Sequence, residues 1–371
     1  MNANNFPIRI LHVFGIMNCG GAETFIMNVY RNIDREKVQF DFIVHSQDEG
    51  YYDDEIKSLG GVKYVVPKFK GTNLIDYKKS WKFFFDTHSE YRIIHSHIRS
   101  TASIFLKIAK RQGLKTIIHS HSTSSGSGFS AYVKDLLQLP LRDIADYRFA
   151  CSTEAGKWLF RKRDFNIVKN GINSEEYIYN MKSREYVREK LGLDGKFVIG
   201  HIGRFNEPKN HFFIVDIFKT IHEMDPKSAL LLVGEGDLRL EVENRINELN
   251  LQSNVIFTGI RSDIPELLHA MDVFLFPSLY EGLGIVVIEA QAAGLPCVVS
   301  DTVPEEVAIT DLVDFFSLRK SEKEWSEQIM KYIGYGKRLD TSEKIKKSGY
   351  EINEQVTFLE KFYLDNMVVK N

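Results

Sequence analysis

The stretch Val273-Phe-Leu-Phe-Pro-Ser-Leu-Tyr-Glu-Gly-Leu-Gly-Ile-Val-Val-Ile-Glu289 indicates a strand, a glycine-bearing loop and a helix in succession. Val273–Phe276 is apolar enough for a buried strand, and Pro277 ends that strand because proline cannot donate to a sheet ladder. A helix that begins at such a loop presents backbone N–H groups and the positive end of its dipole to an anion. The stretch therefore predicts an anion site at the edge of a parallel sheet.

Two carboxylates belong to this stretch, Glu281 on the loop and Glu289 inside the helix. A carboxylate is badly placed beside a phosphate, so both residues are better suited to the hydroxyl groups of a ligand that carries phosphate and sugar. Such a ligand is a nucleotide sugar. The alternative is that Glu281 caps the helix and Glu289 lies on its solvated face. Gly282 and Gly284 favour the binding site because they permit a close backbone approach.

The order of elements along the chain predicts an α/β protein with two domains. A chain of 371 residues exceeds the usual size of one core. Strand-like runs alternate with helical patterns, first from Ile8–Phe14 to Asn166–Val168 and again from Phe197–Ile202 to Phe315–Ser317. The polar segment 171–189 between the two series is the expected linker. We predict two doubly wound domains that face each other across a cleft, followed by a helix near residues 350–366.

Composition limits the class of protein. The hydrophobic and charged fractions are 43% and 26%, which is ordinary for a globular protein. Cys19, Cys151 and Cys297 lie far apart, so neither a disulfide framework nor a cysteine zinc site is expected. The first residues lack the pattern of a signal peptide, and no apolar run approaches the ~20 residues of a membrane-spanning helix. We expect a cytoplasmic protein.

The net charge of −2 conceals an uneven distribution. Residues 1–172 hold 25 Lys and Arg against 17 Asp and Glu, whereas the remainder holds 23 against 33. Basic clusters occur at Lys107–Lys115 and at Arg161–Arg163, the latter beside Trp158, Leu159 and Phe160. This pattern suggests an anionic partner, such as a lipid pyrophosphate or a membrane surface. Nucleic acid is not expected because no nucleic-acid motif is present. The alternative is a chance asymmetry on a solvated face.

A glycine loop, Gly15-Ile-Met-Asn-Cys-Gly-Gly-Ala-Glu23, follows the first expected strand. Gly20 and Gly21 would allow an anion to approach the N-terminus of the next helix. The spacing does not match the dinucleotide fingerprint Gly-x-Gly-x-x-Gly, so no redox cofactor is expected. A structural turn without a ligand is the alternative.

Histidine pairs end two expected strands, His95 with His97 and His119 with His121. Ligand sites of α/β domains lie at this edge, where a histidine can bond a sugar hydroxyl or share the charge of a reacting group. A purely structural hydrogen bond is the alternative. We expect no metal here, because no carboxylate stands nearby at ligand spacing.

Three residues near the first strand of the second series suit a pyrophosphate. Gly203 bends the chain, Arg204 offers a bidentate fork and Lys209 offers a point charge. Solvated surface cations are the alternative. Arg261 follows another strand end, in a loop that is suitably placed to form a wall for a nucleotide base.

Taken together, these residues resemble the GT-B glycosyltransferases of the retaining group called family four. Gly20-Gly21-Ala22-Glu23 resembles the N-terminal glycine loop of that family, and Asn170-Gly171-Ile172 resembles its segment before the linker. Gly203-Arg204 with Lys209 matches the phosphate-binding pair. Glu281 to Glu289 matches the Glu-x7-Glu signature. Asn173 departs from the family, which often has Asp there.

The resemblance implies a retaining transfer from a nucleotide sugar without a metal or other cofactor. Residues 1–172 would bind the acceptor, 173–349 would bind the donor, and 350–371 would form a helix that crosses back to the first domain. Glu289 would hold the ribose hydroxyls and Glu281 the donor sugar, and His119 would lie near the reacting sugar. His121 is the alternative in a second register. The leaving diphosphate would meet Arg204, Lys209 and the backbone N–H groups of Gly284, Ile285 and Val286.

The favoured function is therefore a hexosyltransferase that uses a UDP-linked, or less readily a GDP-linked, sugar. Its acceptor would be a saccharide or a polyprenyl-linked saccharide in surface polysaccharide biosynthesis, reached at the inner face of the membrane. One alternative is a UDP-sugar 2-epimerase with the same architecture, which needs no acceptor. Another is a non-catalytic subunit that binds a nucleotide sugar, which measured donor hydrolysis would distinguish.

Overall fold

The computed structural model describes residues 6–126, 128–336 and 338–367. The chain divides into two compact units: unit 1 comprises Met1–Ile172 together with Tyr350–Asn371, and unit 2 comprises Asn173–Gly349. Residues 1–5 of the expected first domain and 368–371 of the expected C-terminal segment lie outside the described residues.

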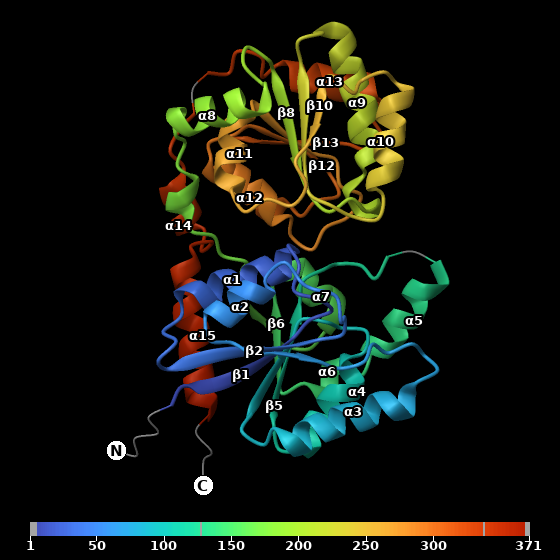
Figure 1. Ribbon diagram of the computed structural model, residues 1–371, viewed down its shortest axis with the longest axis vertical. Coiled ribbons are helices and arrows are strands. Elements are labelled where there is room, and N and C mark those ends of the chain that lie inside the picture. The colour runs from blue at the N-terminus through green and yellow to red at the C-terminus, as the bar shows by residue number, and fades with distance from the viewer. Residues whose placement is uncertain (1–5, 127, 337, 368–371) are drawn as a thin grey trace. The chain divides into compact units, whose positions relative to one another are not determined.

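Unit 1 is built on a parallel sheet with the order β3-β2-β1-β4-β5-β6-β7 (Figure 1). The central strands are almost wholly buried because crossover helices cover both faces, which explains their continuous apolar runs. The strands are β1 (Ile8–Val13), β2 (Val38–Val44), β3 (Lys63–Val65), β4 (Ile93–Ser96), β5 (Lys115–Ser120), β6 (Tyr147–Ala150) and β7 (Asn166–Ile167).

The helices of unit 1 pack apolar stripes on this sheet. In α1, for example, Phe25, Ile26 and Val29 repeat at helical spacing and are buried. The helices are α1 (Gly21–Asn32), α2 (Asp53–Ser58), α3 (Leu74–Thr87), α4 (Ala102–Arg111), α5 (Gly128–Gln138), α6 (Leu141–Ile144), α7 (Thr153–Phe160) and α15 (Ile352–Met367).

The last helix, α15, belongs to unit 1 although it follows unit 2 in sequence. It lies beside β1 and β2 and contacts α1 (Figure 1). Its buried face includes Leu359 and Tyr363. The chain leaves and re-enters unit 1 at one place, because Ile172 N–H donates to Tyr350 O at 2.8 Å and Ile352 N–H donates to Ile172 O at 2.9 Å.

Unit 2 is a second parallel sheet, with the order β10-β9-β8-β11-β12-β13. Its strands are β8 (Val198–Ile202), β9 (Ala229–Val233), β10 (Val255–Phe257), β11 (Val273–Phe276), β12 (Cys297–Ser300) and β13 (Val313–Phe316). Its α-helices are α8 (Met181–Leu191), α9 (His211–Met224), α10 (Arg239–Glu248), α11 (Ile264–Ala270), α12 (Ile285–Ala292), α13 (Glu322–Met330) and α14 (Ser342–Lys347), and its 3₁₀ turns are η1 (Ser174–Tyr177), η2 (Glu207–Lys209) and η3 (Glu305–Val307). The predicted class, doubly wound α/β in each domain, is confirmed.

The predicted linker at 171–189 contains the boundary between the units, which follows Ile172, but most of the segment folds into η1 and α8 of unit 2. Helix α8 begins where the Asn180 carboxamide oxygen accepts from the backbone N–H groups of Lys182 and Ser183, and it ends at Gly192 in the left-handed conformation. Its apolar periodicity is weak because the residues that it buries include Arg188 as well as Val187.

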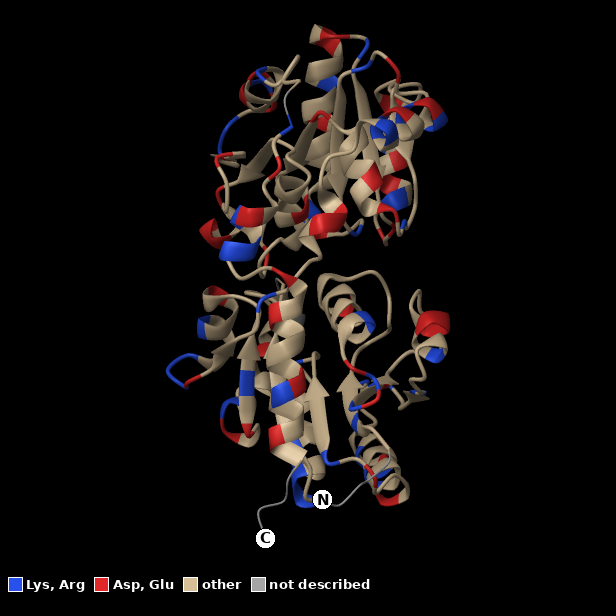
Figure 2. Ribbon diagram, turned by 90° about the vertical axis from the view of Figure 1, so that its left-hand side faces the viewer, with Lys and Arg blue, Asp and Glu red and all other residues tan. Residues whose placement is uncertain are grey.

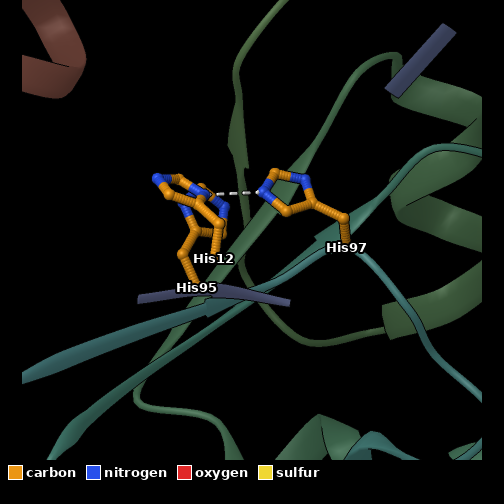
Figure 3. Close-up of side chains that lie close together, drawn as sticks. All are labelled: His12, His95 and His97. Atoms are coloured by element: carbon orange, nitrogen blue, oxygen red, sulfur yellow. Dashed lines mark hydrogen bonds between the residues drawn. The ribbon is translucent and has the colours of Figure 1, made fainter. Parts of the chain in front are cut away.

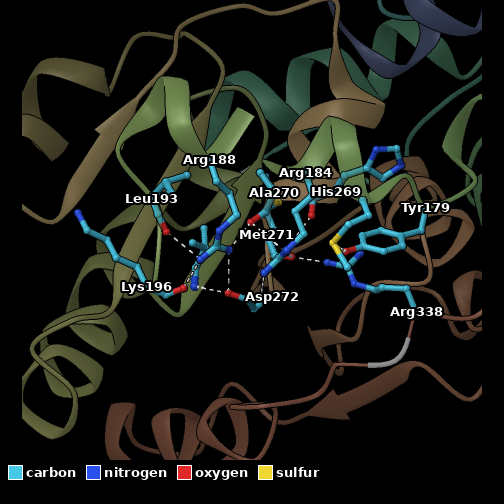
Figure 4. Close-up of polar contacts among 12 residues, drawn as sticks. Tyr179, Arg184, Arg188, Leu193, Lys196, His269, Ala270, Met271, Asp272 and Arg338 are labelled. Atoms are coloured by element: carbon cyan, nitrogen blue, oxygen red, sulfur yellow. Dashed lines mark hydrogen bonds and ion pairs between the residues drawn. The ribbon is translucent and has the colours of Figure 1, made fainter. Parts of the chain in front are cut away.

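Three arginines fix α8 and the segment before α14 to the corner between α11 and β11 (Figure 4). Arg184 donates to the Met271 carbonyl at 3.0 Å and to Asp272 Oδ1 at 2.6 Å. Arg188 donates to Ala270 O at 2.9 Å and Leu193 O at 2.8 Å, and Arg338 donates to carbonyls of the same corner. Cations at the C-terminus of α11 also complement its dipole. We call this group the arginine clamp.

We predict that Arg188→Ala destabilises unit 2, because carbonyl groups and the Asp272 carboxylate would lose a buried charged donor. Breaking such a network costs about 3 kcal/mol, which corresponds to roughly 5–10 °C in the unfolding midpoint of a domain of this size. Calorimetry on full-length protein measures the midpoint. Lys182→Ala, an exposed change on the same helix, is the control. An equal effect of the two changes would contradict the role of the clamp.

Candidate functional site

The winding of unit 2 reverses between β8 and β11. The chain proceeds from β8 to β9 and β10 on one side, whereas β11, β12 and β13 follow on the other. Ligands of open α/β sheets bind at the carboxyl ends of the strands at such a point. The loops after β8 and β11 are joined here, because Leu279 N–H donates to Pro208 O at 2.8 Å and the Asn210 carboxamide donates to Pro277 O at 3.1 Å.

An ion pair at this edge joins Lys209 to Glu281. Lys209 Nζ lies 2.6 Å from Glu281 Oε1, and the two side chains are only 17% and 13% exposed. The ammonium group also lies 4.5 Å from the centre of the Phe276 ring. A cation that is this far removed from water interacts more strongly with an anion than a solvated lysine does. Two residues that the sequence analysis assigned to different parts of a ligand therefore contact each other directly.

Glycine is required where the loops of this edge approach closely. Gly284 has φ of 89° and caps the N-terminus of α12, a conformation that is costly for other residues. A Cβ on Gly234 would lie 2.2 Å from Gly203 O, so the loops after β8 and β9 pack backbone against backbone. Gly282 lies on the bend before Gly284. The N–H groups of Ile285 and Val286 point out of the N-terminal end of α12, where an anion can accept from them.

Glu289 lies in the middle of α12 and is 6% exposed. This burial raises the pKa of Glu289 to about 7, and a hydrogen bond with the Tyr177 side chain opposes the rise. The alternative that Glu289 lies on a solvated helix face is wrong. A buried carboxyl group without a cation costs stability, and such groups are more frequent at functional sites than elsewhere.

The structure does not gather all the expected cations at this ion pair. The Arg204 side chain is 64% exposed, and its guanidinium lies 3.5 Å from Asp237. Arg261 makes a two-bond contact with Asp263, at 2.7 and 2.6 Å. Gly203, by contrast, lies next to Lys209, because a Cβ on Gly203 would be 3.2 Å from Lys209 Cδ.

The glycine loop of unit 1 lies at the N-terminus of α1. Gly20 is the residue before the helix and Gly21 is its first residue. A Cβ on Gly20 would lie 2.3 Å from Glu23 Oε2, which is the end of a flexible side chain. An anion at this loop would therefore have to displace the Glu23 carboxylate.

The two candidate histidines differ in exposure. His119, on β5, is fully buried, whereas His121, just beyond the strand, is partly exposed. Their ring centres lie 4.0 Å apart, and His121 Nε2 lies 2.9 Å from His97 Nδ1. Burial lowers the pKa of His121 to about 3, so its ring is neutral at physiological pH. This conformation leaves His119 no surface for a ligand, and His121 is the better candidate for direct contact.

The sequence analysis missed two residues of interest. Arg99 follows β4, stacks 4.6 Å from the Trp158 ring and has a buried Nη1 atom with no hydrogen-bond partner among the described residues. Burial lowers the pKa of Arg99 to about 10, and its charge contributes to the low pKa of His121. Tyr177, in η1, contacts Glu289. Neither residue lies in a sequence pattern that would identify it.

Family models match both units. A model described as "Glycosyl transferases group 1" matches residues 183–358, and a model described as "Glycosyltransferase Family 4" matches residues 19–176. The chain is 36% identical to the putative glycosyltransferase EpsF of Bacillus subtilis (strain 168) over 375 residues, or 97% of each chain. It is 24% identical, over the full length of both chains, to the Escherichia coli UDP-Gal:alpha-D-GlcNAc-diphosphoundecaprenol alpha-1,3-galactosyltransferase.

A solved structure has the same fold. The crystal structure of Anabaena HepE in complex with UDP and glucose superposes with a TM-score of 0.79, and the match covers 96% of this chain and 100% of that chain. The two sequences are 17% identical, so this likeness concerns the fold.

We predict that Glu289→Gln raises the stability of unit 2 at pH 8 but not at pH 5. The folded-state pKa of about 7 exceeds the ordinary value of 4.5, so the folded state binds more protons between these values and loses stability as pH rises. Gln does not titrate, and the gain at pH 8 should approach about 3 kcal/mol. Thermal unfolding at both pH values measures it.

Glu185→Gln, which changes an exposed carboxylate on α8, is the control and should show no such pH dependence. If the Glu289→Gln difference is the same at pH 5 and pH 8, the pKa of Glu289 is not raised.

Proposed function

The chain belongs to the family 4 glycosyltransferases, and on that premise we propose that it transfers a sugar with retention from a nucleotide-diphosphate sugar, without a divalent cation. The observation that carries the proposal is the edge of unit 2 where the Lys209–Glu281 pair, the Gly284 turn and the buried Glu289 follow β8 and β11. The fold class is GT-B. The family matches do not support the epimerase alternative.

The leaving diphosphate would lie against Lys209 and the first turn of α12. Lys209 supplies a point charge, and the N–H groups of Gly284, Ile285 and Val286 supply the dipole end of a helix. Arg204, which is exposed, would swing toward the phosphates from its contact with Asp237. These groups would provide the positive charge that a metal ion provides in other transferases.

The two glutamates would recognise hydroxyl groups. Glu289, inside α12, would accept from the ribose hydroxyls, and the Tyr177 contact would hold its carboxyl group. Glu281 would accept from the donor sugar while it keeps Lys209 in place, because a carboxylate accepts several hydrogen bonds. Arg261 would stand beside the base, as its place after β10 suggests.

Unit 1 would supply the acceptor side. His121, rather than the expected His119, would contact the reacting sugar, with His97 fixing its ring. Gly20 and Gly21 would approach the diphosphate or the acceptor after Glu23 moves. Arg99, with its unpartnered Nη1, would meet an acceptor phosphate.

We propose UDP as the nucleotide and a lipid-linked saccharide as the acceptor. The HepE structure contains UDP, and the E. coli relative is named for UDP-galactose and a diphosphoundecaprenol acceptor. A Staphylococcus aureus relative that is 24% identical is named as a capsular polysaccharide biosynthesis glycosyltransferase, which supports a role in surface polysaccharide synthesis.

The two basic clusters that were expected to attach the protein to a membrane do not form an exposed surface of basic and apolar residues. Leu159 and Phe160, expected beside the basic run 161–163, are buried in the core, and Trp158 stacks on Arg99. Lys110 is paired with Asp146. Figure 2 shows Lys and Arg of unit 1 interspersed with Asp and Glu rather than gathered in one patch.

Helix α5 offers an apolar surface instead. Phe129, Tyr132, Val133 and Leu136 recur at helical spacing and are exposed, Phe129 to 81%. Figure 1 shows α5 at the side of unit 1, away from its sheet. Among the described residues, no helix is long and apolar enough to cross a membrane. We propose that α5 rests on an anionic membrane surface.

We predict that Lys209→Ala lowers kcat/KM for the donor by roughly 10- to 100-fold, because it removes a charged hydrogen bond worth ~1.5–3 kcal/mol. Release of UDP from UDP-sugars measures this, with and without added Mg²⁺ or Mn²⁺. Lys219→Ala, on the exposed part of α9, is the control. Wild-type rates in Lys209→Ala would refute its role, and turnover only with Mg²⁺ or Mn²⁺ would refute the metal-independent mechanism.

The anomeric configuration of the donor sugar should persist in the product. This expectation follows from the family and not from the distances in the site. The NMR coupling constant at the anomeric carbon of the isolated product measures it. An inverted product would exclude the retaining mechanism.

Vesicles rich in anionic lipid should bind the protein at low salt, and Phe129→Ser should weaken that binding about tenfold. Removing an aromatic ring that the membrane would bury costs at least ~1.5 kcal/mol, and salt should screen the electrostatic part. Co-sedimentation measures the bound fraction. Phe83→Ser, which changes a 70% exposed phenylalanine on α3, is the matched control. Absence of binding to anionic vesicles would favour a soluble acceptor.

A further inference from the structure

Five histidine rings lie together at the carboxyl edge of the unit 1 sheet. His12 is on β1, His95 is on β4 and His119 is on β5, while His97 and His121 follow β4 and β5. These three strands are neighbours, and His12 pairs with His95 in the sheet register. The ring centres of His12 and His95 lie 5.2 Å apart, and those of His95 and His97 lie 4.4 Å apart. The topology therefore concentrates imidazole groups in one buried place.

Three of these rings converge. His12, His95 and His97 are buried, and each offers a ring nitrogen so that the three atoms lie within 4.8 Å of one another (Figure 3). His12 Nδ1 is 3.1 Å from His97 Nε2. Two nitrogens bound to one tetrahedral Zn²⁺ at 2.0–2.1 Å are separated by about 3.3 Å. One ligand pair thus already has the required separation, and the third nitrogen lies within 4.8 Å of both.

The outer nitrogens of two rings are engaged by other groups. His97 Nδ1 lies 2.9 Å from His121 Nε2, and His95 Nδ1 lies 2.7 Å from the Tyr363 hydroxyl. If each Nδ1 carries the proton and donates it to its partner, both Nε2 atoms present a lone pair. Metal-binding histidines are oriented in this way, because the nitrogen that does not bind the metal donates to a neighbouring acceptor.

The expected third ligand atom has no partner of another kind. His95 Nε2 is inaccessible and has no hydrogen-bond partner among the described residues. An unsatisfied buried polar atom costs free energy. A metal ion would satisfy this atom, because imidazole binds a metal through the lone pair of a ring nitrogen.

We propose that His12, His95 and His97 form a Zn²⁺ site in unit 1, with a fourth position for water or an anion. Imidazole nitrogens suit zinc and other first-row transition metals, whereas Mg²⁺ and Ca²⁺ prefer oxygen. The group contains no carboxylate, so the fourth ligand would be an anion such as hydroxide, which would offset part of the buried charge. Three histidines and one open position are also found in catalytic zinc sites.

The zinc site is separate from the proposed donor site. It uses neither Lys209 nor Glu289, which belong to unit 2, and it uses neither His119 nor His121 as a ligand. His121 would act from outside by accepting from His97. A second group, His97 with His119 and His121, has comparable spacing. It would use as a metal ligand His121, the histidine that is proposed to contact the sugar. The expectation of no metal near these histidines rested on the absence of carboxylates, which an all-histidine site does not need.

Metal titration of tag-free, full-length protein tests the proposal. After dialysis against a chelator and then against metal-free buffer, Co²⁺ should bind with one equivalent and give the visible absorption of a tetrahedral ion. Zn²⁺ should displace it and should raise the unfolding temperature. Wild-type protein that binds neither ion at micromolar concentration would overturn the proposal.

Three variants locate the site. His95→Gln should reduce Zn²⁺ affinity at least about 100-fold, and Tyr363→Phe, which keeps every ligand, should reduce it about tenfold through loss of the outer hydrogen bond. His88→Gln, on the same unit but outside the group, should bind as the wild type does. Circular dichroism checks that each variant folds. Wild-type affinity in both His95→Gln and Tyr363→Phe would place the metal elsewhere and refute the site.

Discussion

The carboxyl edge of the unit 2 sheet is held by the contact between Lys209 Nζ and Glu281 Oε1, which lie 2.6 Å apart. This ion pair joins the loop after β8 to the loop after β11, on the two sides of the point where the winding reverses. Two hydrogen bonds hold the same loops together: Leu279 N–H donates to Pro208 O, and the Asn210 carboxamide donates to Pro277 O. A largely buried cation is thereby held by the loop that leads into α12, a helix whose first backbone N–H groups favour an anion.

A costly group lies at this edge. Glu289 occupies a buried position in α12 where an apolar residue would be more stable, and its carboxyl group is hydrogen-bonded to Tyr177. Tyr177 is itself held, since its carbonyl accepts from His269 Nε2 at 3.1 Å and the arginine clamp fixes the adjoining corner. The arginine clamp thus fixes α8 to the corner next to Tyr177, the residue that contacts Glu289. Strained or costly groups that persist in this way are typical of functional sites.

The sequence predicted the fold class and the elements that carry the candidate site wherever local patterns hold the information. The strand, glycine turn and helix at 273–289 were predictable because proline and glycine mark the turn and apolar runs mark buried strands. Helix α8 was not, because its buried residues include Arg188, which donates to Ala270 O, 82 residues away, as well as to the nearby Leu193 O. The burial of His119 and the convergence of His12 on His97 likewise depend on which strands become neighbours, and spacing along the chain does not record that.

Amide hydrogen–deuterium exchange with and without UDP tests the central claim most directly, because it reports where the nucleotide binds in the intact chain. The account predicts slower exchange in the UDP complex for residues 203–209 and 283–289, the loop that holds Lys209 and the start of α12. Unchanged exchange in both segments, with UDP shown to be bound, would contradict it. So would protection confined to unit 1.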